Sequence, residues 1–331
     1  MKVSNSGGRA RALVVVSIAL GVSACTVPKA LQTPIERSTY REILERQAEG
    51  VGIEDETLKE LPPMTAADYE RLGDTYLMQN KLGLANVKYV KALELDPTAW
   101  RVQYKLGVLL LKQNVPQQAL LNFNAIVAVD SMNARGHEGR GRALLAMGQH
   151  EEAEKALRTA LDLDSGLWKA HETMGVLCDA LGRFPEAIDS YHMALKIQPN
   201  EPSVLNNLGV AYYLSKDYGR AIPTFERALT VTPAAERARV YNNLGRAYAK
   251  KGSYPRAYEA FRKGSDTATA YNNLGMIYLE DGRTKQAASC FQKAIHASPT
   301  YYAEATENLR SAQAGLSDPE DGPMRVAAAC P

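Results

Sequence analysis

Two His-Glu pairs come nearest to a metal-dependent active site in this sequence. His137 precedes Glu138, and His171 precedes Glu172. A helical zinc-protease site holds its metal between two histidines four residues apart, with the adjacent glutamate as the general base. In both places the residue four positions after the histidine is a glycine. We therefore interpret both pairs as ordinary residues of repeated helices and predict no metal site.

Other catalytic patterns are equally incomplete. Gly139-x-Gly141 lacks the third glycine of a dinucleotide-binding loop, because Leu144 stands there and no strand precedes it. The sequence contains no phosphate-binding loop, no nucleophile elbow and no paired-cysteine spacing. It therefore predicts a protein that is not an enzyme and needs no cofactor. Turnover by a purified chain without any partner would contradict this prediction.

The composition is ordinary for a folded, water-soluble chain, with 45% hydrophobic and 23% charged residues. Lys+Arg 39 against Asp+Glu 37 gives a formal net charge of +2. Three of the basic residues lie in a segment that we expect to be cleaved, which leaves 36 basic against 37 acidic residues. This balance gives no indication of a nucleic-acid-binding protein.

The first 25 residues have the pattern of an export signal. A basic stretch precedes the apolar run at residues 12–22, which is too short to span a bilayer as a permanent helix. The following segment, Val22-Ser23-Ala24-Cys25, resembles the lipobox of bacterial lipoproteins. The alternative is a plain secretory signal in which the cysteine is incidental.

The lipobox resemblance implies that the Cys25 thiol receives a diacylglyceryl group and that residues 1–24 are removed. Several acyl chains hold a protein stably on a membrane, whereas one chain binds only marginally. Thr26 follows the cysteine instead of Asp, which in proteobacterial lipoproteins implies transport to the outer membrane. We expect an outer-membrane lipoprotein whose remaining residues are in the periplasm.

Small and large residues recur in one register along most of the chain. A glycine recurs at intervals of 34, 34, 34, 34, 36 and 30 residues. An alanine follows each glycine by twelve residues, and an aromatic residue or leucine follows that alanine by four. The glycines are Gly73, Gly107, Gly141, Gly175, Gly209, Gly245 and Gly275, and the large residues are Tyr89, Phe123, Leu157, Tyr191, Phe225, Phe261 and Phe291.

Two antiparallel helices per repeat account for these columns, because small residues let two helix backbones approach while large ones fill the space between neighbours. The pattern resembles the tetratricopeptide repeat (TPR) over residues 66–299. This resemblance implies an all-α, right-handed TPR solenoid of about seven helix-turn-helix repeats with a C-terminal capping helix. Since one repeat cannot bury its apolar face alone, stacking must supply the core.

The pattern divides the chain into five segments. Thr65 is the predicted N-cap for the first repeat helix. The 36-residue interval inserts two residues after Pro233, where a turn can absorb them. The 30-residue interval predicts that the second helix of unit six ends near Gly264. A short helix is expected within the tether at residues 37–49. The segments are the signal peptide at 1–24, the lipidated cysteine and tether at 25–65, the array at 66–299, the capping helix at 300–314 and a flexible tail at 315–331.

The remaining cysteines show no obvious pairing. Cys178 and Cys290 lie in the fourth and seventh units, and repeats that far apart in a solenoid are beyond disulfide reach. Cys330 lies in the tail, where we expect an exposed thiol.

In TPR arrays the first helix of each unit lines a concave groove. The string Asn-Asn-Leu-Gly recurs in units five, six and seven, and asparagine amides can hydrogen-bond the backbone of an extended peptide. The alternative is that these asparagines are merely solvated or capping residues of a common repeat. The predicted groove residues are Asn206, Asn207, Tyr213, Arg239, Asn242, Asn243, Arg246, Lys250, Asn272 and Asn273.

The earlier units place basic and acidic residues on the same side. A basic groove for acidic segments is one interpretation, and a mixed, solvated wall is the interpretation that we favour. The basic residues are Arg101, Lys105, Lys112, Arg135, Arg142 and Lys169, and the acidic ones are Glu70, Asp74, Glu138, Glu172 and Asp179.

The order of lipobox, tether and TPR array resembles the TPR lipoproteins of tight-adherence (Tad/Flp) pilus assembly. The shortened unit before Ala270 and the segments Ser298–Tyr302 and Glu307–Leu309 add to this resemblance. It implies an adaptor that binds segments of a secretin or another pilus component, with no nucleic acid or small-molecule substrate. The alternatives are a pilotin-like lipoprotein of type IV pilus biogenesis and a scaffold for envelope hydrolases.

Overall fold

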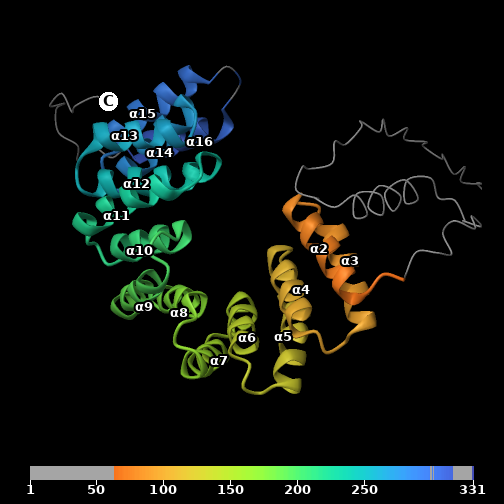
Figure 1. Ribbon diagram of the computed structural model, residues 1–331. Coiled ribbons are helices and arrows are strands. Elements are labelled where there is room, and N and C mark those ends of the chain that lie inside the picture. Colours follow the sequence, from red (N-terminus) through yellow and green to blue (C-terminus); the bar gives the residue numbers. More distant parts are fainter. Residues whose placement is uncertain (1–62, 299, 301, 316–329) are drawn as a thin grey trace, which may run out of the picture. The chain divides into compact units, whose positions relative to one another are not determined.

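The computed structural model describes residues 63–298, 300, 302–315 and 330–331, which contain fifteen α-helices and one short 3-10 helix, η2 (Figure 1). The helices are α2 (Ala66–Met78), α3 (Leu82–Leu95), α4 (Trp100–Lys112), α5 (Pro116–Val129), α6 (Ala134–Ala146), α7 (His150–Leu163), α8 (Trp168–Ala180), α9 (Phe184–Ile197), α10 (Pro202–Leu214), α11 (Tyr218–Val231), η2 (Ala234–Glu236), α12 (Arg237–Lys250), α13 (Tyr254–Gly264), α14 (Thr267–Glu280), α15 (Thr284–Ala297) and α16 (Ala303–Gly315).

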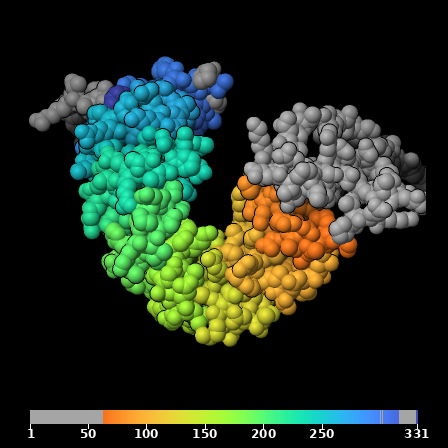
Figure 2. All heavy atoms as spheres, viewed as in Figure 1, coloured from red at the N-terminus to blue at the C-terminus, as the bar shows by residue number. Residues whose placement is uncertain are grey.

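The helices form seven antiparallel pairs, from α2–α3 to α14–α15, and α16 packs against the last pair. Each pair contacts the pairs before and after it in the sequence, which the space-filling view shows as colours in sequence order (Figure 2). The prediction of an all-α array of helix pairs with a final helix is confirmed. No helix of the described residues is long and apolar enough to cross a bilayer.

The glycine column marks the place where the two helices of a pair cross. A Cβ atom added at Gly209 of α10 would lie 2.5 Å from Cε1 of Phe225 on α11, which is closer than real Cβ contacts allow. The ring of Phe225 therefore occupies the space that the missing side chain leaves. The same close approach joins Gly73 to Tyr89, Gly107 to Phe123, Gly141 to Leu157, Gly175 to Tyr191, Gly245 to Phe261 and Gly275 to Phe291.

Three local predictions can be compared directly with the helix ends. The Thr65 side chain accepts a hydrogen bond from the backbone N–H of Asp68, whose carboxylate accepts from Thr65 in return, so the predicted N-cap is confirmed as a capping box. The second helix of unit six ends at Gly264, as predicted. The two-residue insertion after Pro233 is taken up by the turn that contains η2. The expected signal peptide and the helix at 37–49 lie outside the described residues.

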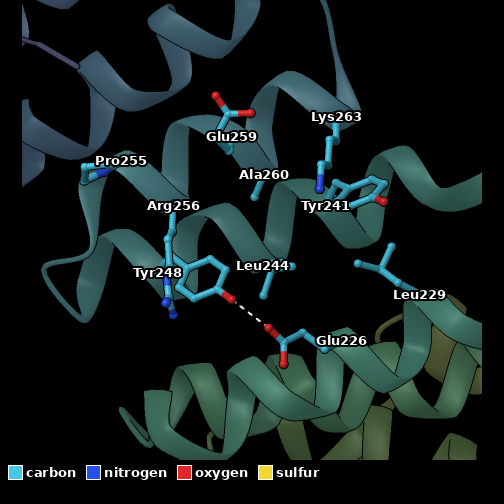
Figure 3. A pocket seen from close by; sticks show the side chains of 10 residues that line it. All are labelled: Glu226, Leu229, Tyr241, Leu244, Tyr248, Pro255, Arg256, Glu259, Ala260 and Lys263. Carbon is cyan, nitrogen blue, oxygen red and sulfur yellow. Dashed lines mark hydrogen bonds between the residues drawn. The ribbon is translucent and has the colours of Figure 1, made fainter.

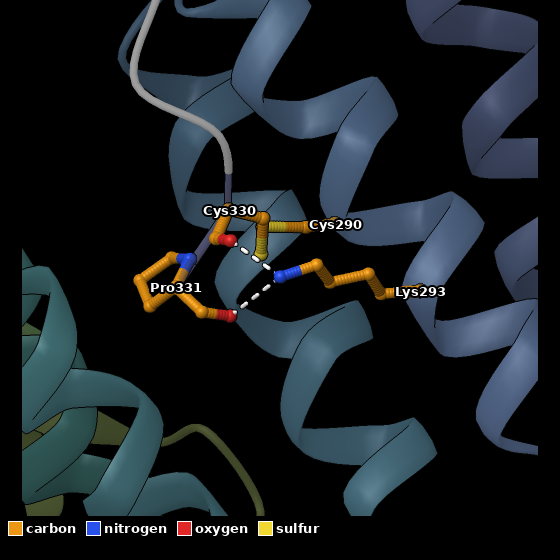
Figure 4. The surroundings of a disulfide bond; sticks show 4 residues. All are labelled: Cys290, Lys293, Cys330 and Pro331. Carbon is orange, nitrogen blue, oxygen red and sulfur yellow. Dashed lines mark hydrogen bonds between the residues drawn. A yellow bond between two sulfur atoms is a disulfide. The ribbon is translucent and has the colours of Figure 1, made fainter.

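The end of the chain differs from the prediction. Cys330 forms a disulfide with Cys290 of α15 and is only 3% exposed (Figure 4). The expectation of an exposed thiol and no cysteine pair is therefore wrong: residues 330–331 return to α15, across a sequence separation of 40 residues. Cys178 is a buried free thiol, and the predicted capping helix corresponds to α16.

Candidate functional site

The first helices of successive pairs contact one another directly, from α4 with α6 to α14 with α16. We call the side of these helices that carries Lys105, Glu138, Asn207 and Asn243 the inner face. Its residues recur once per repeat at equivalent positions. Side chains from neighbouring repeats are thus arranged in a row, which is the arrangement that an extended ligand requires.

The inner face of the first two repeats contains a cluster of paired charges. Lys105 Nζ donates to Glu70 Oε1 and to Asp74 Oδ2, both at 2.7 Å. Partial burial works against the charged ammonium, but these two hydrogen bonds raise the pKa of Lys105 overall. Lys105 is thus neutralised by two carboxylates, which favours a mixed wall over a basic groove at this position.

The third repeat places a nearly buried carboxylate on the same face. Glu138 is 1% exposed, accepts a hydrogen bond from Tyr104 Oη at 2.7 Å and lies 3.5 Å from Arg142 Nη1. Burial of a carboxylate is tolerated where such partners offset the loss of water. Glu138 therefore joins the second repeat to the third.

The two histidines beside glutamates have structural contacts of their own. The ring nitrogen Nε2 of His137 lies 2.9 Å from the carbonyl oxygen of Ser131, and Nε2 of His171 lies 3.0 Å from that of Ser165. Both histidines thus hold the turn that precedes their helix. No cluster of potential metal ligands occurs in the part of the chain that the structure describes.

The asparagines link successive helices of the inner face. Asn243 Nδ2 donates to Asn206 Oδ1 at 3.0 Å, and Asn308 Nδ2 of α16 donates to Asn272 Oδ1 at the same distance. Asn206 is 4% exposed and Asn272 is 1% exposed. The amide groups of these two residues therefore serve the stacking of repeats, and α16 joins the array as the first helix of a further repeat would.

The pair formed by Asn242 and Asn273 is an exception. Both side chains are partly exposed, and no hydrogen bond joins them to each other or to another described residue. Asn242 is in α12 and Asn273 is in α14, the helices before and after α13. The helix α13 has 11 residues, where most second helices have 14. The amide of Asn273 is thus open to a ligand. So is that of Asn207, which among the described residues accepts one long side-chain hydrogen bond, from Asn206 at 3.4 Å.

A small pocket lies on the inner face between α10 and α12. It has a volume of about 150 Å³, and a cavity of this size can hold a group as large as benzene. The guanidinium of Arg246 lies 5.6 Å from the centre of the Tyr213 ring, within cation–π range. The lining residues are Val210, Tyr213, Leu214, Phe225, Asn243 and Arg246.

The pocket brings together three of the predicted groove residues: Tyr213, Asn243 and Arg246. Sequence reasoning missed Val210. This residue directly follows the column glycine of its repeat, as Arg246 does, so the repeat position of Arg246 could have indicated it. Phe225 was assigned only to the core, yet it also lines this pocket.

The other predicted groove residues lie outside this pocket. Lys250 Nζ is paired with Asp281 at 2.6 Å and with Glu280 at 3.4 Å, which links the sixth repeat to the seventh. Arg239 is exposed at the start of α12.

Asp179 is a partly buried carboxylate with one oxygen unpartnered within the described residues. Its repeat position is that of Tyr213, and its Oδ2 accepts a hydrogen bond from Tyr191 at 2.8 Å, while its Oδ1 has no partner among the described residues. Burial raises the pKa of Asp179 to about 6, against the opposing effect of the Tyr191 hydrogen bond.

We expect Asn243→Ala to lower the free energy of unfolding by about 1–2 kcal/mol, because it leaves the buried Asn206 carbonyl without a donor. Asn273→Ala is the matched control: it removes the same side chain from the same repeat position, where no described hydrogen bond is lost, and should change the free energy by less than about 0.5 kcal/mol. Urea unfolding of the two variants checks this, and equal losses would contradict the structural role of Asn243.

Comparisons with known proteins agree with this architecture. Family profiles described as tetratricopeptide repeat match residues 104–167, 200–265 and 268–301, and one described as TPR repeat matches residues 179–216. Together they cover more than half of the chain. No curated protein matches significantly.

Solved structures with a similar fold include three that differ widely in length. A tetratricopeptide repeat protein from Parabacteroides merdae is 18% identical with a TM-score of 0.50, covering 75% of this chain and 98% of that one. pilF of Pseudomonas aeruginosa is 22% identical with a TM-score of 0.52, covering 66% and 97%. A chain of the APC/C hetero-tetramer Cut9-Hcn1 is 20% identical with a TM-score of 0.56, covering 84% of this chain and 54% of that one.

At these identities the structures show a shared fold alone. The profiles and the helix pairs agree on the repeat and on its register. The chain belongs to the tetratricopeptide repeat family, whose arrays are scaffolds for protein–protein interaction.

Proposed function

We propose that the protein is a membrane-anchored adaptor that binds an extended segment of a partner protein on the inner face between α10 and α12. The observation that carries this proposal is the pocket shared by Tyr213, Asn243 and Arg246. An aromatic ring, an amide and an exposed guanidinium there can contact an apolar side chain, a backbone group and an acidic group of the same segment. The partly exposed amides of Asn207 and Asn273 lie in the neighbouring positions of the row.

Anchoring through lipid on Cys25 belongs to the same proposal, with the array on the periplasmic side of the outer membrane. The lipobox-like segment before Cys25 supports it. The Cys290–Cys330 disulfide also supports an exported protein, because such bonds persist in oxidising compartments such as the bacterial periplasm.

The proposed process is pilus assembly, with a secretin or another assembly component as the partner. The order of lipobox, tether and array, which resembles Tad/Flp lipoproteins, favours the tight-adherence system. The second candidate is a pilotin-like role in type IV pilus biogenesis, and the fold similarity to pilF favours it. Capture of envelope hydrolases instead of pilus components would favour a scaffold for those enzymes.

Capture of proteins from the native envelope tests the proposed binding face. We expect Arg246→Glu combined with Asn207→Ala to reduce capture of the partner at least tenfold, with the thermal unfolding temperature nearly unchanged, because Arg246 is exposed and Asn207 accepts only one long hydrogen bond. Arg158→Ala is the control, since Arg158 is exposed on α7 and its ion pair within the described residues is with Glu154 of the same helix. Undiminished capture by the double variant would rule out the inner face as the binding site.

The anchor is tested separately. Cys25→Ala should move the protein from the membrane fraction to the soluble fraction and abolish labelling by a radioactive fatty acid. Labelling that persists in this variant would contradict lipidation at Cys25. It would not affect the proposal that the inner face binds a partner.

A further inference from the structure

A second, larger groove lies on the other side of α12 from the inner face. It has a volume of about 540 Å³ and is formed by α11, α12 and α13 (Figure 3). Tyr241, Leu244 and Tyr248 of α12 line it, and these positions are on the opposite side of the helix from Asn243 and Arg246. We call it the outer groove. Ala260 and Lys263 of α13 complete its wall.

The equivalent place one repeat later is occupied by the chain itself. A shift of 30 residues takes Ala260 to Cys290 and Lys263 to Lys293. Cys290 is bonded to Cys330, and Lys293 Nζ donates to the backbone oxygen of Cys330 at 2.6 Å and to that of Pro331 at 2.9 Å (Figure 4). A segment of polypeptide is thus bonded there through Cys330, and its backbone oxygens contact Lys293.

One repeat earlier, the equivalent basic residue also holds a backbone carbonyl. Arg227 occupies the register position of Lys263, and its Nη2 donates to the carbonyl oxygen of Pro199. Lys263 itself is exposed and makes no hydrogen bond or ion pair within the described residues. Four basic residues share this register position: Lys91, Arg227, Lys263 and Lys293. Two of them, Arg227 and Lys293, bind backbone oxygens. Lys263 faces the open outer groove, and Arg227 also lines an equivalent groove of about 470 Å³ one repeat earlier.

The two carboxylates at the outer groove have partners other than Lys263. Glu226 accepts a hydrogen bond from Tyr248 Oη at 2.6 Å, and Glu259 is paired with Arg262 at 3.2 Å. Both carboxylates at the groove are therefore already engaged. The small side chain of Ala260 leaves room where Cys290 carries a disulfide in the next repeat.

We propose that the outer groove binds an extended segment of a partner protein, with a small side chain against Ala260 and successive backbone carbonyls on Lys263. The occupant is a polypeptide because the occupied equivalent groove holds one in this manner. Backbone recognition of this kind depends on the extended shape of the segment and on small side chains more than on a particular sequence. The site is independent of the inner face and gives the adaptor a second partner.

A peptide with the sequence of residues 326–331 is the probe, with a fluorophore on its amino terminus, an amidated carboxyl terminus and serine in place of cysteine. Fluorescence anisotropy would measure its binding to the full chain with the Cys290–Cys330 disulfide intact. We expect saturable binding, a loss of affinity of tenfold or more for Lys263→Ala, and recovery of most of it for Lys263→Arg, since the preceding repeat uses Arg227. Lys251→Ala should bind within twofold of the unmodified chain, because Lys251 is exposed and does not line the groove.

Three outcomes would overturn the proposal: no saturable binding by the unmodified chain, equal affinities for Lys263→Ala and Lys251→Ala, or a loss caused by Arg246→Ala instead. The last outcome would place the peptide on the inner face. Circular dichroism of each variant establishes that the helices are retained, so a loss of binding is not a loss of fold.

Discussion

Phe225→Ala should lower the free energy of unfolding by about 3–5 kcal/mol, the range measured when large buried aromatic side chains are truncated. Phe225 is fully buried, and its ring fills the space that Gly209 leaves between α10 and α11. The same ring lines the inner pocket beneath Tyr213 and Asn243. Alanine would leave a cavity at the helix crossing where the ring of Phe225 now lies against Gly209.

Chemical denaturation followed by circular dichroism measures this loss. Thr230→Ala on the same helix is the control, because Thr230 is exposed and bonds only to a carbonyl of its own helix turn, so its replacement should cost less than about 0.5 kcal/mol. A loss below about 1 kcal/mol for Phe225→Ala would mean that the glycine and aromatic columns do not meet at helix crossings, and the register of the array would be wrong.

Replacing both Cys290 and Cys330 with alanine should destabilise the last repeat by about 3–4 kcal/mol. The disulfide closes a loop with a sequence separation of 40 residues, and in the chain-entropy description a loop of that length restricts the unfolded chain by about this amount. The bond also holds residues 330–331 where Lys293 binds their carbonyls. Hydrogen exchange of α14 and α15 measures the effect where it is expected.

A reductant provides the control for this prediction. It should lower the unfolding temperature of the unmodified chain and leave that of the double variant unchanged, because Cys178 is a free thiol and contributes no second disulfide. An unmodified chain that is insensitive to reductant would show that the last repeat is stable without the bond.

The array could be predicted from the sequence because its determinants are local and periodic. Small and large residues that recur every 34 positions fix which helices cross and where, as the approach of Gly209 to Phe225 shows. Thr65 with Asp68 specified the start of the first helix. The 30-residue interval, which is four residues shorter than the usual 34, specified the early end of α13 at Gly264. Each of these depends on neighbours along the chain.

Contacts between distant residues could not be predicted in the same way. The return of Cys330 to Cys290 depends on the path of a segment without periodicity, so no spacing indicated it. The repeated Asn-Asn string also has two roles that look alike in the sequence. The first asparagine of the string is buried between repeats at Asn206 and Asn272, whereas the second is partly exposed at Asn207 and Asn273.

The linear order of contacts has a consequence for how the protein opens. Within the described residues, α2–α3 packs against one neighbouring pair, whereas α14–α15 packs against a pair, against α16 and against the disulfide-held residues 330–331. In a one-dimensional stack, stability is a sum of nearest-neighbour couplings, and the end with fewer couplings frays first. Thermal fluctuations should therefore unfold the repeats in order from α2 onward, while the repeats nearest α16 remain folded.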